Sequence, residues 1–155
     1  MRDIIIMAFL SILPISELRG AIPFAVGQDF PWYMAWPVCS GINAAAAPLC
    51  WLFLSTFHKL FLRMAWYHAF FDRFIERARA KLRPGVEKWG AAGIAFFVAI
   101  PLPITGAWTG TLGAWVLGIP KAKTMLAVIL GVIISGGIVS AVTVLGIQAL
   151  RLFTR

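Results

Sequence analysis

Two charged residues lie inside an otherwise apolar stretch near the start of the chain. Glu17 and Arg19 interrupt the stretch Ile4–Val26, where each ionisable side chain costs about 2.5–3.5 kcal/mol on membrane-insertion scales. A carboxylate in such a place can bind and release a proton, and a guanidinium can hold an anion such as a phosphate with its fork of donors. The alternative is a structural ion pair that holds the local fold together. We expect a functional role.

A second group of polar side chains lies in the apolar stretch Gly90–Gly118. Its members are hydroxyls and one indole, beside two glycines: Thr105, Thr109 and Thr111, Trp108, and Gly106 and Gly110. Helix N-termini beside the glycines would direct amide N–H groups at an anionic group. Alternatively, the hydroxyls only satisfy a broken backbone. In the stretch between, Asn43 is expected either to bridge helices or to line the cavity.

The sequence contains few features that would indicate an enzyme. His58 and His68 have no carboxylate or cysteine at ligand spacing, so we expect no metal. Cys39 and Cys50 would stand roughly 16 Å apart on one helix, too far for a disulfide. No nucleophile elbow, phosphate loop, CxxC or HExxH occurs, and we therefore expect no enzyme and no cofactor.

The composition indicates a membrane protein. Of 155 residues, 61% are apolar and 13% are charged, whereas soluble domains have about 25% charged residues. The excess apolar surface needs lipid as its solvent, and we predict a single transmembrane domain over residues 1–155. The net charge of +8 comes without a nucleic-acid recognition motif, so we expect contact with lipid headgroups and not with nucleic acid.

Two of the four apolar stretches predict ordinary spanning helices. These are Trp36–Phe57 and Thr124–Leu150, and each is long enough to cross the hydrocarbon core. The last stretch carries Gly131, Ser135, Gly136 and Gly137, which suit close packing against another helix.

The other two stretches are broken by proline and glycine. The interrupting residues are Pro14, Gly20 and Pro23 in the first, and Pro101, Pro103, Gly106 and Gly110 in the third. Broken backbone at membrane depth is tolerated only where protein or a water-filled cavity surrounds it. We therefore predict re-entrant helical hairpins, with breaks near Pro14–Gly20 and Pro103–Gly110.

The two halves of the chain repeat each other. Leu13–Ser16 reads LPIS and Leu102–Thr105 reads LPIT, and each copy lies in a broken stretch followed by an intact one. A hairpin returns to its own side and the following helix crosses, so the second unit begins on the opposite side. The predicted fold is all-α: two inverted units, residues 1–57 and 90–155, each a hairpin followed by a transmembrane helix.

Residues 58–89 predict an amphipathic, basic helix lying in the membrane interface. Apolar side chains recur at helical spacing while Arg73, Arg77 and Lys81 occupy another face, and Pro84–Gly85 is expected to end the helix. With re-entrant hairpins, ten basic residues lie on the side of this linker and three at the termini, so the linker should face the cytoplasm. A plain four-span arrangement fits the charge count equally well, and the prolines and glycines favour re-entrance.

Two segments resemble a known family. LPISELRGAIPFAVG at Leu13–Gly27 and PLPITGAWTGTLGAWVLG at Pro101–Gly118 are similar to the two signature regions of the small multidrug export protein family, which resembles the wider DedA superfamily. The resemblance implies paired re-entrant hairpins and movement of lipids or protons across the membrane. Many DedA proteins carry charged residues in the second hairpin, where this chain has Gly106 opposite Glu17 and Trp108 opposite Arg19.

Residues and resemblance together predict a small multi-pass transporter of the cytoplasmic membrane. The expected substrate and proton pathway comprises Pro14, Ser16, Glu17, Arg19, Gly20, Asn43, Pro103, Thr105, Gly106, Trp108, Thr109 and Gly110. Glu17 would couple transport to protons, and Arg19 would contact an anion or counter-ion. A lipid translocase for polyprenyl phosphate or a phospholipid is the alternative, and a non-transporting membrane assembly factor is a third. We expect a homodimer, with the glycine-rich last helix as a contact.

Overall fold

The computed structural model describes residues 2–56, 73, 76, 79, 80, 82–102 and 105–153. Every regular element in these residues is a helix, so the all-helical class is confirmed. The helices are α1 (Arg2–Ile12), α2 (Glu17–Gly27), α3 (Trp32–Ala44), α4 (Ala46–Thr56), α7 (Ala91–Ala99), α8 (Ala107–Val116) and α9 (Lys121–Phe153). Residues 82–89 are helical as well.

The first broken stretch forms two short helices that pack against each other. α1 and α2 have 11 residues each, about 16 Å or half of a bilayer core, and residues 13–16 form the turn between them. The expected interruptions at Gly20 and Pro23 are wrong, because α2 runs through both. Its buried face, which includes Ile22, packs in the main core and keeps the helix intact past the proline.

The second stretch was predicted as an ordinary spanning helix, and the segment Trp32–Thr56 is long and apolar enough to be one, although it is not continuous. It forms α3 and α4, separated by a turn at Ala45. Pro48 has no N–H for the carbonyl four residues before it, and its ring clashes with that carbonyl. The turn at Ala45 places Pro48 in the first turn of α4, where no such bond is required.

The third stretch is broken where the sequence predicted, between α7 and α8. Residues 100–102, 105 and 106 of the connection are not helical. Gly110 was expected to belong to the break, but it lies inside α8. A β-carbon at Gly110 would overlap the side chain of Val98, so this glycine lets α8 approach α7.

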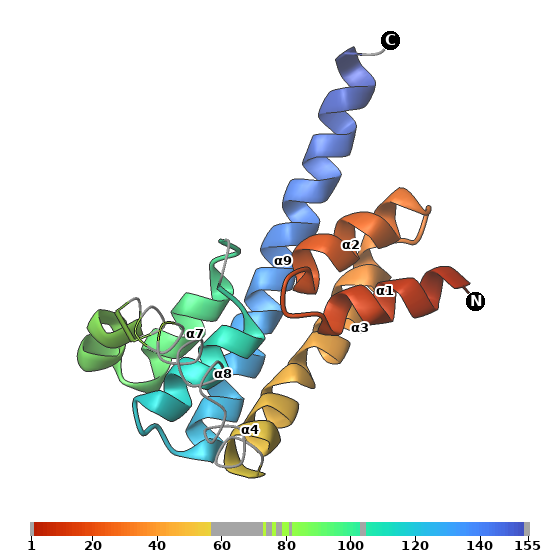
Figure 1. Ribbon diagram of the computed structural model, residues 1–155. Coiled ribbons are helices and arrows are strands. Elements are labelled where there is room, and N and C mark those ends of the chain that lie inside the picture. The colour runs from red at the N-terminus through yellow and green to blue at the C-terminus, as the bar shows by residue number, and fades with distance from the viewer. Residues whose placement is uncertain are drawn as a thin grey trace.

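The helices surround the long helix α9, which contacts both halves of the chain (Figure 1). α1 and α2 pack against each other and against α3, and α2 also contacts α9. α7 and α8 pack against α9, with α8 also against α4. α3 and α4 run in the opposite direction to α9 (Figure 1). The segments Trp32–Thr56 and Lys121–Ala149 are each long and apolar enough to cross a membrane.

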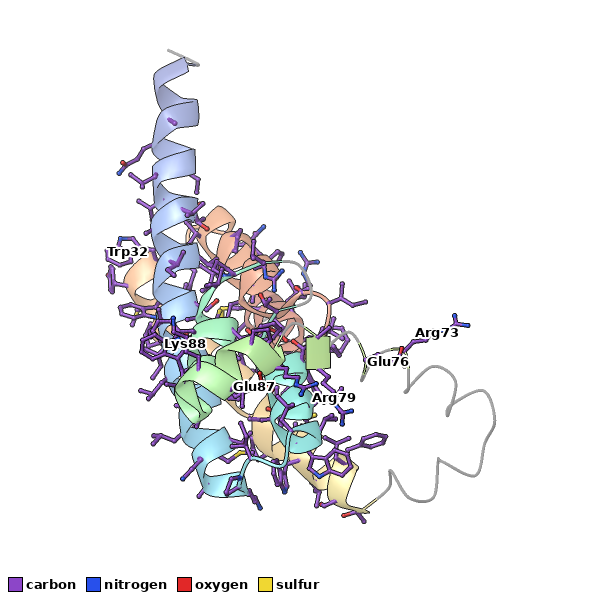
Figure 2. The ribbon with its side chains drawn as sticks, turned by 90° about the vertical axis from the view of Figure 1, so that its left-hand side faces the viewer. Trp32, Arg73, Glu76, Arg79, Glu87 and Lys88 are labelled. Atoms are coloured by element: carbon purple, nitrogen blue, oxygen red, sulfur yellow. The ribbon has the colours of Figure 1, made fainter. Side chains whose placement is uncertain are left out.

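Most of the linker 58–89, including His58 and His68, lies outside the described residues. Arg73, Glu76 and Arg79 are exposed, and Figure 2 shows Arg73 and Glu76 well away from the helical body. Leu82 is buried in the main core of the protein.

The helix does not end at Pro84–Gly85, and that prediction is wrong. Residues 82–89 are helical, and the run ends at Gly90 with φ 57°. Gly85 faces Gly93 of α7 so closely that a β-carbon at Gly93 would overlap the Gly85 carbonyl. This close helix contact holds the backbone helical past the glycine.

The glycines of α9 pack against helices of the same chain. A β-carbon at Gly131 would lie 2.7 Å from the β-carbon of Val98 and 2.8 Å from the carbonyl oxygen of Ala95. One at Gly136 would lie 2.7 Å from Cδ1 of Trp36. The prediction that the small residues of this helix serve close packing against another helix is confirmed.

Gly131→Ala should destabilise the protein, because the new methyl group meets the backbone of α7, which cannot move aside as a flexible side chain would. We expect a loss of about 1–3 kcal/mol in the free energy of unfolding, measured by thermal unfolding of the purified protein. Gly146→Ala in the same helix is the matched control. A β-carbon there meets nothing within 4 Å, so the control should be neutral or stabilising by up to about 1 kcal/mol. Equal effects of the two substitutions would contradict the packing shown.

Candidate functional site at the junction of the two breaks

The C-terminal end of α1 is held by side chains from other helices. The last carbonyls of a helix have no partner within it and need one elsewhere. The carbonyl of Ser11 accepts a 2.7 Å hydrogen bond from Nδ2 of Asn43 on α3. The carbonyl of Ile12 accepts a 2.8 Å bond from Nε1 of Trp108 on α8. The first break is therefore closed by a residue from the second half of the chain.

The N-terminal end of α8 is held in turn by the first half of the chain. Oε2 of Glu17 lies 3.3 Å from the backbone nitrogen of Ala107, and the backbone N–H of Trp108 also bonds this carboxylate. A carboxylate at a helix N-terminus satisfies free N–H groups and interacts favourably with the helix dipole. Glu17 is 8% exposed, so the contact lies inside the protein.

The backbone of Glu17 adopts a conformation that side chains rarely take. Its φ is +46°, in the left-handed region, at a cost of order 1 kcal/mol or more for a residue other than glycine. This conformation occurs at the first residue of α2, directly after the turn 13–16. The surrounding contacts keep the carboxylate aimed at α8 in spite of this cost.

Gly106 makes room for the Glu17 carboxylate. A β-carbon at Gly106 would overlap all three terminal atoms of the Glu17 side chain, Cδ and both oxygens. The φ of Gly106 is 166°, an ordinary extended backbone that any residue adopts. Glycine is therefore required here because a side chain would have no room.

Arg19 also reaches across to the second break. Its guanidinium donates a hydrogen bond to the carbonyl of Thr105. The Thr105 hydroxyl holds the same turn: it accepts from the Leu102 N–H at 3.0 Å and lies 2.6 Å from the Ile100 carbonyl. Within the described part of the chain, Glu17 and Arg19 form no direct ion pair with each other. Each of the two charged side chains therefore bonds a backbone group at the second break, and the two side chains do not bond each other.

Five of the predicted pathway residues thus meet at one junction: Glu17, Arg19, Thr105, Gly106 and Trp108. Asn43 adjoins the junction through Ser11. Thr109 lies on the first turn of α8, with its hydroxyl 3.4 Å from the Gly106 carbonyl.

The remaining predicted residues have other surroundings. Gly110 serves packing, and a β-carbon at Gly20 would overlap the hydroxyl of Ser16. Pro14 is exposed in the turn, and Pro103 lies outside the described residues.

Two participants were not predicted from the sequence. Ser11 is fully buried and offers the carbonyl that Asn43 binds. Cys50 of α4 directs its thiol at the Trp108 carbonyl over 3.7 Å. A backbone acceptor has no sequence signature, but the position of Ser11 one residue before the end of α1 follows from locating the break at Pro14.

The junction offers one carboxylate, one guanidinium and the amides of a helix N-terminus. These groups can exchange a proton and recognise an anion. Among the residues that the structure describes, no three His, Cys, Asp or Glu side chains lie together in a way that could hold a metal ion.

The sequence from Glu17 to the middle of α9 matches a protein-family model. The match covers residues 17–138, and the family is described as "Putative small multi-drug export protein". The chain belongs to this family. In this member of the small multidrug export family, the matched region begins at Glu17 and includes the whole of the second break. Together with two candidate spans, the family indicates a membrane protein. No curated protein and no solved structure matches the chain.

Gly106→Ala should displace the Glu17 carboxylate from α8 and destabilise the protein by about 1–3 kcal/mol. Gly27→Ala is the matched control, because a β-carbon at Gly27 meets nothing within 4 Å. Adding Glu17→Ala removes the atoms that the new methyl group would overlap. The double variant should therefore lose less stability than the sum of the two single variants in thermal unfolding. Strict additivity would show that the two residues do not touch.

Trp108→Phe should leave the Ile12 carbonyl without its donor at the buried end of α1. We expect a loss of about 1–3 kcal/mol in unfolding free energy. Trp89→Phe makes the same change at an exposed tryptophan (57% exposed) and should cost little. If both variants unfold alike, the indole bond to Ile12 contributes nothing to stability.

Proposed function

We propose that this protein is a proton-coupled secondary exporter whose substrate pathway passes through the junction of the two breaks. The observation that carries the proposal is the buried carboxylate of Glu17, which belongs to one half of the chain and holds the N-terminus of α8 in the other. Protonation removes the negative charge from this contact. A neutral carboxyl group interacts less strongly with the amides and dipole of α8, so proton binding changes how firmly the halves are joined.

The proposal includes two inverted units, each a re-entrant hairpin followed by a spanning helix. Three features support it. The hairpin-forming pairs α1–α2 and α7–α8 each precede a long apolar segment. These two segments run in opposite directions (Figure 1), and both pairs contact α9, the first through α2 and the second through α7 and α8. Inverted repeats whose broken helices meet in the middle are a recurrent plan of secondary transporters.

Equivalent positions of the two repeats also perform equivalent tasks. When Leu13–Ser16 is aligned with Leu102–Thr105, Arg19 stands opposite Trp108. Arg19 donates to a carbonyl in the second break, and Trp108 donates to a carbonyl at the first. The charged residues that many related superfamily members carry in the second hairpin are replaced here by an indole donor and a glycine, which supports a single proton-binding site at Glu17.

A lipid translocase is the second candidate, and one observation favours it. The Arg19 guanidinium contacts the second break at Thr105, and the α8 N-terminus begins two residues later at Ala107, and such donors suit the phosphate of a polyprenyl phosphate or phospholipid. In liposomes, inhibition of export by soluble headgroup analogues would favour this candidate, and a lack of competition would favour the exporter.

We also propose that the basic linker 58–89 faces the cytoplasm and that the protein acts as a homodimer. Basic residues concentrate on the cytoplasmic side of membrane proteins, and in the re-entrant arrangement Lys121 and Lys123 at the start of α9 lie on the same side as the linker. For the dimer, α9 offers an exposed apolar face beyond the helix contacts, with Val142 and Leu145 each 64% exposed.

Glu17→Gln should abolish proton coupling while keeping the size of the side chain and one acceptor oxygen for the amides of α8. In proteoliposomes with an imposed pH gradient, wild-type protein should move protons and substrate together. The variant should lose gradient-driven substrate movement and its dependence on pH. Glu87→Gln, the same change at an exposed carboxylate outside the junction, should behave as wild type.

Unchanged coupling in the Glu17→Gln protein would overturn the role of this residue. No transport of protons, drugs or lipids by wild-type protein would favour a membrane assembly factor.

A further inference from the structure

A cavity of about 220 Å³ lies at the open end of the α1–α2 pair, away from the junction. The two helices spread apart from the turn 13–16, so the start of α1 and the end of α2 border this end (Figure 1). The volume is below the range of about 300–1,000 Å³ that drug-sized molecules occupy, and it suits one small group. The lining residues include Asp3, Ile4, Met7, Phe24, Gln28 and Phe30.

The cavity carries one charge, and this charge is negative. Asp3 is the only charged residue that lines it. Among the described residues, the charged partner of Asp3 is Arg2 at 3.9 Å, and the side chains of Asp3 and Arg2 are 53% and 89% exposed. An ion pair this open contributes little to stability, so the carboxylate is available to a ligand. α2 ends beside the cavity at Gly27, and the negative end of a helix dipole also favours a cation.

Apolar groups make up most of the remaining wall. Phe24 and Phe30 are among them, and a cation is attracted to the face of an aromatic ring. A primary ammonium brings three N–H donors, whereas the lining offers side-chain acceptors only on Asp3 and Gln28. A methylated ammonium has no N–H to satisfy, and its methyl groups suit the apolar wall.

We infer that this cavity binds a methylated ammonium group, supplied either by the choline headgroup of a phospholipid or by a free quaternary amine. Asp3 provides the opposite charge, and Phe24 and Phe30 provide aromatic surface. Binding requires neither transport nor a proton gradient, so the inference is independent of the proposed function.

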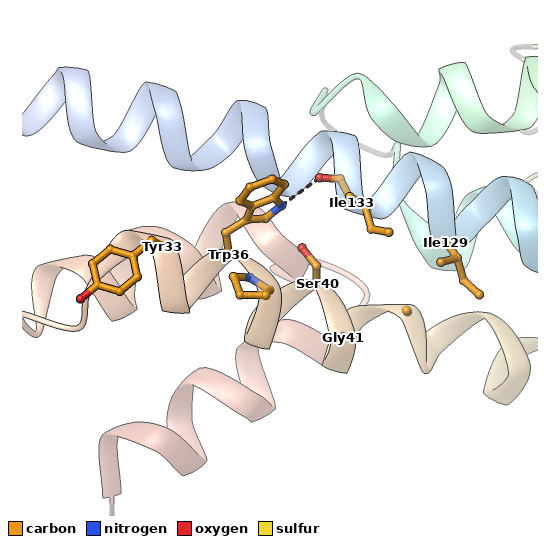
Figure 3. A pocket seen from close by; sticks show the side chains of 8 residues that line it. Tyr33, Trp36, Ser40, Gly41, Ile129 and Ile133 are labelled. Atoms are coloured by element: carbon orange, nitrogen blue, oxygen red, sulfur yellow. Dashed lines mark hydrogen bonds between the residues drawn. The ribbon is translucent and has the colours of Figure 1, made fainter.

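The residues that follow the cavity place it near the level of the lipid headgroups. Trp32 and Tyr33 begin the apolar segment Trp32–Thr56 and are 47% and 61% exposed, and such side chains gather at membrane–water interfaces. One turn further on, Trp36 donates a 2.9 Å hydrogen bond to the Ile133 carbonyl of α9. Figure 3 shows this bond, with the hydroxyl of Tyr33 pointing away from α9. A lipid headgroup therefore reaches the cavity from the membrane surface, and a free amine reaches it from the water.

The test compares two ligands that differ in charge and hardly in shape. Choline and its neutral isostere 3,3-dimethylbutan-1-ol are offered to the purified protein in dodecyl maltoside, a detergent without an ammonium group. Saturation transfer to isotope-labelled methyl groups of each ligand, read by NMR, measures binding. Choline should bind saturably and about tenfold more tightly than the isostere. Equal binding of the two ligands would overturn the inference.

Asp3→Asn removes the negative charge of the cavity. It should weaken choline binding about tenfold, to the level of the isostere. Asp29→Asn is the matched control, because it makes the same change at an exposed carboxylate that does not line the cavity. Asparagine also tolerates the φ of 60° found at that position. Equal losses of choline binding in the two variants would contradict a specific site at Asp3.

Phe30→Leu keeps an apolar wall and removes the aromatic ring. It should weaken choline binding about threefold and leave binding of the neutral isostere unchanged. Phe9→Leu makes the same change at a phenylalanine of α1 that is 61% exposed and lies outside the cavity, and it should affect neither ligand. A loss of isostere binding equal to that of choline in Phe30→Leu would show that the ring does not recognise the charge.

Nanodiscs distinguish the two sources of the ammonium group. If a phospholipid headgroup occupies the cavity, soluble choline should bind in phosphatidylglycerol discs and be excluded in phosphatidylcholine discs. If a free amine is the ligand, soluble choline should bind equally in both. An absence of saturable choline binding in the phosphatidylglycerol discs would overturn the inference.

Discussion

The ends of broken helices inside an apolar bundle carry backbone groups that must find hydrogen-bond partners, because neither lipid nor apolar side chains can provide them. α1 ends at Ile12 and α8 begins at Ala107, and each of these ends is satisfied by the other half of the chain. The polar residues within the apolar stretches are located where this requirement arises. Neither helical pair is complete without the other, so the two halves have to assemble together.

The contacts that join the breaks differ in kind from those that join the helices. α7 and α9 meet through close backbone approach at Gly131, and residues 82–89 meet α7 at Gly85 and Gly93. Such packing leaves little freedom for sliding. The junction depends instead on a carboxylate, a guanidinium and an indole, each bonded to backbone groups. Polar bonds of this type can be exchanged for bonds to water or a ligand with a small net change in free energy, so the proposed transport would change the junction more readily than the helix packing.

The sequence predicted which polar residues lie at the breaks better than it predicted the course of the helices. Proline located the breaks, and an ionisable pair in apolar sequence identified Glu17 and Arg19. Their partners are mostly backbone groups of Thr105, Ala107 and Trp108, which no side-chain pattern encodes. Proline is also a poor guide by itself, because α3 continues through Pro37 while the chain turns before Pro48. Tertiary packing decides whether a helix continues through a proline or ends near it, and the local sequence does not show how the helix will pack.

The length of α9 has a consequence for how the protein lies in its bilayer. A helix of 33 residues is about 50 Å long, whereas the hydrocarbon core is about 30 Å thick. Tilts of about 20° are usual and shorten the span by only a few ångströms. Several turns of α9 therefore extend beyond the hydrocarbon region. Figure 1 shows the C-terminal part of α9 rising past all the other helices, so no other described helix accompanies this part of α9.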